Sequence, residues 1–307
     1  MEPPHTQGAP LWLTAYLFFE GHVYGEAADR VIREVVAPLV EACRPDAVCW
    51  FFLRYAKEGN HVRLRFFAPG PVLEERIWPR VAKAAASSEL VVRSTRERYE
   101  PEVERYGGPW GLALAEELFH RQSETALALL EKIEPGNRSK RLGKGLLAML
   151  VLLFLYRGER RAAAELARRY GTGYLKAWAV DAEQQEHWLR TFQEAFDRQA
   201  DRLAGYVESA WEALESGGEL TPELDTYRRD MGDVVLRLRE LFDEGRLLLG
   251  TRTAADWDEC VRWIVPSYIH MMNNRLGVSI QEESYLSVLI AGTLGEGPKP
   301  GDQLHGD

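Results

Sequence analysis

Residues 48–67 read VCWFFLRYAKEGNHVRLRFF and contain the clearest fold signal in this chain. Two runs rich in aromatic and β-branched residues, 48–55 and 61–67, lie on either side of the polar segment Lys57-Glu58-Gly59-Asn60. Such runs are typical of β-strands, and a short polar segment with glycine is typical of the turn that joins them. The stretch therefore predicts a β-hairpin.

The segments on both sides of this hairpin extend it into a layer of strands and helices. Residues 12–19 and 90–99 have the same strand-like composition, whereas 27–43 and 72–86 repeat apolar residues at helical spacing. The resulting order, β-α-β-β-α-β, is that of a split βαβ, or ferredoxin-like, layer.

The rest of the chain is helical in pattern almost throughout. Breaks that contain glycine or proline are expected at residues 134–137, 170–173, 216–218 and 250–251, and Thr221-Pro222 is expected to begin a helix. The predicted fold class is therefore α+β, with a ferredoxin-like βαββαβ layer followed by a mainly helical C-terminal half.

The domain organisation follows from this change of pattern. We expect residues 11–108 to form the mixed α/β layer and residues 109–294 to form a helical part packed on it as one continuous unit. Residues 1–10 and 295–307 are rich in proline, glycine and polar residues, so they are predicted to be mobile tails.

Composition and charge narrow the class of protein. The 307 residues carry a formal net charge of -9, which disfavours a direct nucleic-acid binder. Cys43, Cys49 and Cys260 form no CxxC pair, so neither a zinc site nor a disulfide framework is encoded. No secretory signal is present, and the apolar run 146–156 is about half the ~20 residues that a membrane span needs. We expect a cytoplasmic protein without a membrane span.

The second strand of the hairpin carries the first group of candidate site residues. Because side chains alternate across a strand, His61, Arg63 and Arg65 share one face and Val62 lies on the other. Arg54 on the neighbouring strand is expected to join the arginines. Two guanidinium groups ~7 Å apart repel unless an anion binds between them. The structural alternative is a solvated sheet face balanced by acidic neighbours.

A second candidate group precedes the helical half. Glu102 and Arg105 are three residues apart, and Tyr106-Gly107-Gly108-Pro109 predicts a tight turn into a helix that begins near Trp110. This turn is expected at the edge of a site. The alternative is that Glu102 and Arg105 only pair with each other.

A third group lies on a predicted helix near the C-terminus. Its apolar residues recur at three- and four-residue steps as Val261, Ile264, Val265, Tyr268, Ile269, Met272 and Leu276. His270 lies beside this stripe, with Ser267 and Asn274 one turn away, and Pro266 is expected to start or kink the segment. A histidine in this place is either a hydrogen-bonded packing residue or a proton carrier.

Together these runs resemble the C-terminal domain of class I lanthipeptide (lantibiotic) dehydratases, which also occurs as a separate chain in thiopeptide gene clusters. The resemblance covers most of the chain. It includes Trp50-Phe51-Phe52-Leu53-Arg54-Tyr55, His61-Val62-Arg63-Leu64-Arg65, Leu118-Phe119-His120-Arg121-Gln122-Ser123 and the helix that contains His270.

The resemblance implies a lyase that removes glutamate from glutamylated Ser or Thr residues of a precursor peptide, giving dehydroalanine or dehydrobutyrine. It implies five catalytic residues, Arg63, Arg65, Glu102, Arg105 and His270. Six neighbours are predicted to bind the substrate: Arg54, His61, Tyr106, Ser267, Asn274 and Arg275. The residues leave open whether His270 acts as base or as acid. No HExxH, phosphate-loop or dinucleotide motif is present, so neither a metal nor a cofactor is expected.

The predicted partners follow from the same resemblance. Because the strand layer begins at about residue 11, we expect the chain to lack a glutamylation domain and to act in trans. Its partners would be a ribosomally made precursor peptide with its leader and a separate glutamyl-tRNA-dependent glutamylation protein. A homodimer is left open.

Two other functions are compatible with the resemblance. Thiopeptide pyridine synthases share this fold but join two dehydroalanines by a formal aza-[4+2] cycloaddition and release the leader peptide. Pyridine synthases have no glutamate to hold. The presence of all five residues, Arg63, Arg65, Glu102, Arg105 and His270, therefore favours elimination. A non-catalytic subunit that binds a leader peptide at the sheet edge is the second alternative, and it leaves that set unexplained.

Overall fold

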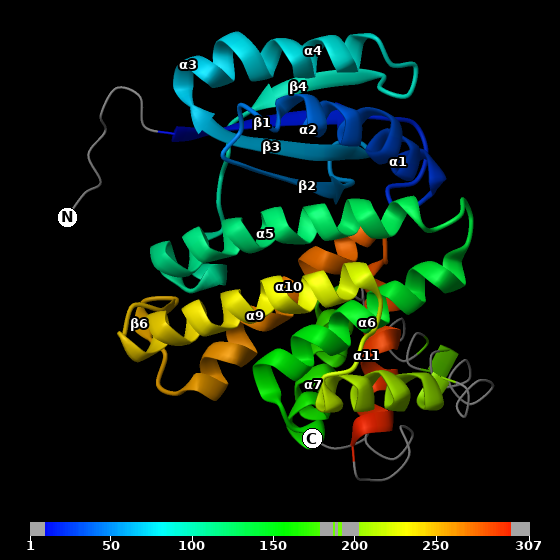
Figure 1. Ribbon diagram of the computed structural model, residues 1–307, viewed down its shortest axis with the longest axis vertical. Helices are drawn as coiled ribbons and strands as arrows, with labels where there is room; N and C mark the ends of the chain where they lie inside the picture. Colours follow the sequence, from blue (N-terminus) through cyan, green and yellow to red (C-terminus); the bar gives the residue numbers. More distant parts are fainter. Residues whose placement is uncertain (1–9, 179–186, 188–189, 192–202, 296–307) are drawn as a thin grey trace.

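The computed structural model describes residues 10–178, 187, 190–191 and 203–295. A four-stranded antiparallel sheet with its helices forms the N-terminal part, and the C-terminal half is mainly helical (Figure 1). The predicted α+β class is confirmed in this form. The parts of the predicted tails at 1–9 and 296–307 lie outside the described residues.

The sheet is built from four strands in the order β2-β3-β1-β4. Their bounds are Pro10–Phe18 (β1), Cys49–Tyr55 (β2), His61–Pro69 (β3) and Arg93–Glu97 (β4). The segment between β1 and β2 consists of α1 (Glu26–Arg30), the π-helical stretch Val31–Val36 and α2 (Ala37–Cys43). The segment between β3 and β4 consists of α3 (Gly70–Val72), the π-helical stretch Leu73–Ile77 and α4 (Trp78–Ala86). The predicted order of strands and helices is confirmed.

The register of β3 gives the sheet two different faces. Val62, Leu64 and Phe66 are completely buried, and they lie on the apolar face in contact with the helices of the strand layer. Arg63 and Arg65 point to the opposite face because successive side chains alternate. The alternation predicted from the sequence thus separates the core from a polar surface.

The edge strand β2 is closed by side chains from the helical half rather than by another strand. Ser123 Oγ accepts a hydrogen bond from the backbone N–H of Phe52 at 3.2 Å. Asn274 accepts from the backbone N–H of Arg54 and donates to its carbonyl, each at 2.9 Å. Backbone groups that would be exposed at a sheet edge are therefore satisfied, and the strand layer is attached to α5 and α10 at this line.

The C-terminal half of the chain is built mainly of helices. A 3-10 turn, Val103–Tyr106, leads into α5 (Gly108–Glu131), α6 (Arg138–Arg157), α7 (Arg160–Trp178), a helix at 203–216, α9 (Pro222–Asp243), α10 (Trp257–Leu276) and α11 (Ile280–Leu294). In Figure 1, α5 runs beneath β2, between the sheet and the other helices. Strands β5 (Leu248–Leu249) and β6 (Arg252–Thr253) form a short hairpin around the break expected at 250–251.

Most of the helix boundaries expected from the sequence are found. The breaks at 134–137 and 216–218 separate helices, and α9 begins at Pro222 after Thr221. Pro266 lies inside α10, so the expectation that it starts this helix is wrong. The apolar run 146–156 is part of α6, and no helix among the described residues is long and apolar enough to cross a membrane.

The break expected at residues 170–173 is wrong, because α7 continues through it. Gly171 lies against α11: a Cβ atom there would be 2.9 Å from Cβ of Ser287 and 3.1 Å from the carbonyl oxygen of Ser284. The absence of a side chain at this glycine allows two helices to approach closely. This close packing places Tyr170 of α7 next to Glu283 of α11.

Candidate functional site

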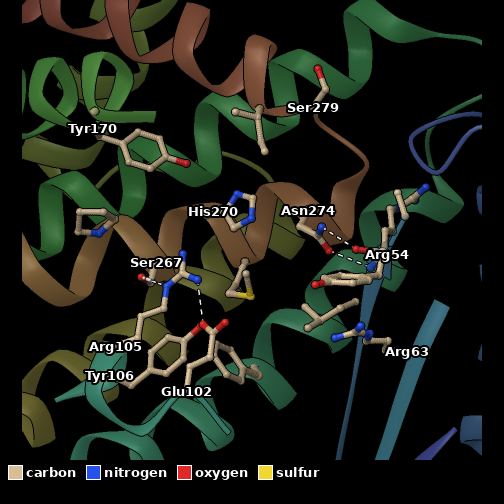
Figure 2. Close-up of a pocket in the computed structure, with 18 of the residues that line it drawn as sticks. Arg54, Arg63, Glu102, Arg105, Tyr106, Tyr170, Ser267, His270, Asn274 and Ser279 are labelled. Atoms are coloured by element: carbon tan, nitrogen blue, oxygen red, sulfur yellow. Dashed lines mark hydrogen bonds and ion pairs between the residues drawn. The ribbon is translucent and has the colours of Figure 1, made fainter. Parts of the chain in front are cut away.

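A cavity of about 2130 Å³ lies where the strand layer meets the helical half (Figure 2). Its wall is formed by β2 and β3, the segment before α5, parts of α7 and α10, and the start of α11. The five residues predicted to be catalytic all line it: Arg63, Arg65, Glu102, Arg105 and His270. Residues more than two hundred positions apart in the chain are thus brought to one place.

Arg63 is held by aromatic rings and by one histidine. Its guanidinium carbon lies 3.3 Å from the ring centroid of Tyr55 and 4.6 Å from that of Tyr16. Its Nε donates a hydrogen bond of 3.2 Å to Nε2 of His61, whose Nδ1 lies 2.8 Å from the carbonyl oxygen of Gly59. That carbonyl only accepts, so Nδ1 carries the proton and His61 is neutral. Burial, together with the positive charge of Arg63, lowers the pKa of His61.

Arg65 lies deeper in the same wall. Only 8% of it is exposed, its guanidinium carbon lies 4.7 Å from the ring centroid of Tyr99, and burial lowers its pKa. Its buried Nε has no hydrogen-bond partner, and neither Arg65 nor Arg63 pairs with a carboxylate in the part of the chain that the structure describes. Two neighbouring cations without a counter-charge favour an anionic ligand here.

Glu102 and Arg105 form the opposite part of the wall. Arg105 donates from Nη1 to Glu102 at 2.8 Å and from Nε to Oγ of Ser267 on α10, also at 2.8 Å. Glu102 and Arg105 do pair with each other, as the structural alternative held, and both still face the cavity (Figure 2). Ser267 therefore helps to hold the Arg105 guanidinium group in position.

The predicted turn between Arg105 and α5 is present. Gly107 and Gly108 both have positive φ, 89° and 82°, a backbone conformation that glycine adopts readily. A Cβ atom on Gly107 would lie 2.9 Å from Cδ1 of Ile264, so the turn is pressed against α10. Tyr106, which is 4% exposed, lines the cavity just before this turn.

His270 is bound to a carboxylate that the sequence did not reveal. Its Nδ1 lies 3.2 Å and 3.1 Å from the two carboxylate oxygens of Glu283, which is completely buried. The hydroxyl of Tyr170 donates to the same carboxylate. Burial is the main cause that raises the pKa of Glu283, and His270 and Tyr170 oppose the rise.

Glu283 was missed because acidic residues near a helix start are usually caps. Its neighbour Glu282 does form a capping box with Ser279. The available signal was spacing: Glu283 lies three residues before the buried Leu286, on the inward side of α11. Tyr170 was missed because a break was expected there.

Arg54 does not join Arg63, contrary to expectation. It pairs across the hairpin with Val62, so its side chain lies on the opposite face of the sheet. The side chain is fully buried and donates to Asp29 at 2.6 Å. Arg54 is among the residues that line the cavity, but its guanidinium group is bonded within the protein interior.

Three other residues predicted to bind substrate are used within the protein. His61 is absent from the cavity wall and supports Arg63. Arg275 is also absent from the wall; it is completely buried and bonded to Gln122. Asn274 reaches the wall, but its amide oxygen and nitrogen both bond to the β2 backbone.

No group of three or more His, Cys, Asp and Glu side chains that could bind a metal ion occurs in the described part of the chain.

The fold is similar to that of three solved structures. TsrL shares 19% identity over 92% of this chain and 94% of its own, with a TM-score of 0.71. The pyridine synthase TbtD from thiomuracin biosynthesis shares 17% identity over 92% of this chain and 97% of its own, with a TM-score of 0.69. The tRNA-dependent lantibiotic dehydratase MibB from Microbispora sp. 107891 shares 20% identity over 96% of this chain, with a TM-score of 0.64.

This chain spans 29% of the length of MibB. At these identities the three similarities establish a common fold. No curated protein matches the sequence. The family model described as the lantibiotic biosynthesis dehydratase C-terminal domain matches residues 12–294, nearly the whole described chain. The chain therefore belongs to the lantibiotic dehydratase C-terminal domain family, as its motifs predicted.

Proposed function

We propose that this protein removes glutamate from glutamylated Ser or Thr residues of a precursor peptide and leaves dehydroalanine or dehydrobutyrine. The observation that supports this best is the cavity wall formed by Arg63 and Arg65, two cations without a carboxylate partner among the described residues. Glutamate on the substrate supplies the missing negative charge. The substrate enters this reaction already glutamylated.

The reaction requires stabilised negative charge at two points. A base removes the Cα proton of the modified residue, and charge develops on the adjacent amide oxygen. The Cα–Cβ double bond then forms as the Cβ–O ester bond breaks, and glutamate leaves as a carboxylate. Fixed guanidinium groups stabilise both charges, and loss of one such donor typically costs ~10²-fold in rate.

The remaining residues have complementary roles. Arg105 is held by Glu102 and Ser267, so its position in the wall is set before substrate binds. His270 lines the same cavity, and an imidazole can act as a proton carrier at cellular pH. We assign the proton transfer to His270 and charge stabilisation to the arginines.

The test uses purified protein and two versions of one peptide. The unmodified precursor should remain unchanged, whereas its Ser-glutamylated form should lose one glutamic acid and gain dehydroalanine, as followed by mass spectrometry. Arg65→Met serves as the matched control and should leave the glutamylated peptide in place. A glutamylated cognate peptide that stays intact with the unaltered protein rejects elimination.

A second candidate is pyridine formation from two dehydroalanines. It is favoured by the similarity to TbtD, which extends over 97% of that pyridine synthase. This reaction holds no glutamate, so it gives no reason for two uncompensated arginines. A peptide that already contains two dehydroalanines separates the candidates: macrocycle formation with loss of the leader supports pyridine synthesis.

A further inference from the structure

We propose that Glu283 is a positioning residue that holds the proton of His270 on Nδ1 and makes Nε2 the atom that exchanges a proton with the substrate. This inference rests on the proposed function for its catalytic meaning. Its structural content, the protonated atom and the charge partner of His270, is testable without any substrate.

The contact between the two side chains is geometrically specific. Both carboxylate oxygens of Glu283 lie near Nδ1 of His270, at 3.2 Å and 3.1 Å. Glu283 is completely buried, and 12% of the His270 side chain is exposed. His270 lines the cavity and Glu283 is absent from its wall, so the carboxylate approaches the ring from the protein side.

The cost of burying this carboxylate indicates a role beyond packing. A buried carboxylate is expensive unless it is paired and hydrogen-bonded. Here one partner is His270 from α10 and the other is the hydroxyl of Tyr170 from α7. The buried carboxylate of Glu283 on α11 is thus contacted from α10 and from α7. The imidazole that it contacts, His270, is the one to which we assign proton transfer.

The proton path follows from this arrangement. With Nδ1–H donated to Glu283, Nε2 on the opposite edge of the ring takes the Cα proton of the substrate. The ring becomes an imidazolium whose positive charge is stabilised by the carboxylate. Nε2 then returns the same proton to the departing glutamate carboxylate or to solvent. The ring ends neutral, so the enzyme is regenerated without another reactant. Carboxylate–imidazole pairs commonly fix tautomer and orientation in this way.

The other ionisable groups around the pair have their own partners. Tyr24, in the loop after β1, is hydrogen-bonded to Asn274, and its pKa is raised by burial and by the charge of Glu283. On α6, which also packs against α11, Arg141 is bound by Asp29, and Arg138 by Glu282. The pH response of the pair is therefore governed by Glu283, His270 and the two tyrosines, Tyr170 and Tyr24.

The first experiment measures the unaltered protein. Histidine ring nitrogens are observed by ¹⁵N NMR, with the His270 signals assigned from a His270→Asn variant. We expect neutral His270 to carry its proton on Nδ1. A ring proton on Nε2 overturns the proposal, because it means that a protonated Glu283 donates to Nδ1. This measurement needs no variant of Glu283 and stands even where such a variant does not fold.

The second experiment uses Glu283→Gln with Glu282→Gln as the matched control. The same chemical change is made at adjacent residues, but Gln at 282 can retain the capping box. In Glu283→Gln, the His270 titration should move to lower pH and kcat should fall ~10²-fold or more. The control should retain the parental titration and rate. Parental kcat and an unmoved titration in folded Glu283→Gln reject the proposal.

The two readouts separate this inference from the proposed function. If the unaltered protein eliminates no glutamate, the proposed function fails, while the NMR titration still decides whether Glu283 controls His270. If elimination occurs but the titration is unaffected by Glu283→Gln, the function stands and this inference fails.

Discussion

Arg54 and Arg63 lie on adjacent strands of one sheet, yet their guanidinium groups have opposite electrostatic surroundings. Arg54 is completely enclosed, donates to Asp29 at 2.6 Å, and also bonds to the backbone carbonyls of Val23 and Arg275. Burial nevertheless lowers its pKa to about 10. Arg63 faces the cavity among aromatic rings, with one neutral histidine as its hydrogen-bond acceptor.

The difference shows that residue type alone does not indicate a role. Alternation along a strand places Arg54 on the face that meets the protein interior and Arg63 on the face that meets the cavity. A buried cation needs partners within the protein, because leaving it unsatisfied is costly. A cavity-facing cation can leave that task to a ligand. Arg54, buried and paired with Asp29, supports the structure, whereas Arg63, which faces the cavity without a carboxylate partner among the described residues, indicates the binding site.

The largest effect in this comparison is expected from removing the carboxylate of Asp29, which Arg54 shares with Arg141. Asp29 is 1% exposed and pairs with both Arg54 and Arg141. Asp29→Asn leaves two buried guanidinium groups without a counter-charge, so the free energy of unfolding should fall by ~3–5 kcal/mol. Urea denaturation measures it.

The control for this prediction is an ion pair on the surface. Glu34 pairs with Arg30 at 2.8 Å while 52% of its side chain is exposed. Glu34→Gln should leave the urea midpoint unchanged, because exposed pairs contribute little. Equal urea midpoints for Asp29→Asn and Glu34→Gln would show that the buried group does not stabilise the fold.

The next prediction compares the same substitution, arginine to methionine, at Arg65 and at Arg54. Arg65→Met removes a cation that is buried without a carboxylate partner and whose pKa is lowered by burial, so the melting temperature should stay the same or rise. Elimination should slow by ~10²-fold. Arg54→Met should lower the melting temperature, because Asp29 and two backbone carbonyls lose their donor.

Thermal unfolding and the rate of glutamate release together decide this prediction. If Arg65→Met instead unfolds the protein while Arg54→Met remains stable and inactive, the roles assigned to the two arginines are reversed.

A smaller effect is expected from the residue that supports Arg63. The folded state favours neutral His61, whose pKa is lowered by burial. The unfolded chain therefore binds more protons below about pH 6.5, and stability is lost as the pH falls through that range. His61→Phe keeps an aromatic ring but removes the titration and the acceptor. Stability should then depend less on pH between about 5 and 6.5.

Activity gives a second readout of the same variant. Arg63 loses one hydrogen bond but keeps its contacts with Tyr16 and Tyr55, so the rate of elimination should fall by about 10-fold. A parental rate together with a parental pH dependence of stability would exclude a supporting role for His61.

Local features of the fold could be predicted because they depend on neighbours in the sequence. The hairpin around Gly59, the alternation of Arg63 and Val62, and the glycine turn before α5 are all found where expected. The break expected at residues 170–173 is absent. Gly171 allows α7 and α11 to pack closely and does not reverse the chain. A glycine has the same local signature in both situations, so only the position of α11 distinguishes them.

The sequence by itself determined the order of strands and helices and the family, because these follow from periodicity and from recognisable runs. It also singled out five residues that all line the cavity: Arg63, Arg65, Glu102, Arg105 and His270. Tertiary structure alone decided which polar residues are available there. Arg54 is enclosed and paired with Asp29, and Arg275 is enclosed and hydrogen-bonded to Gln122. Glu283 of α11 contacts His270 of α10, and the close packing of α7 and α11 at Gly171 brings Tyr170 to the same carboxylate. The physical reason is that the free energy of a buried charge depends on what surrounds it in space. Those surroundings come from residues far away along the chain.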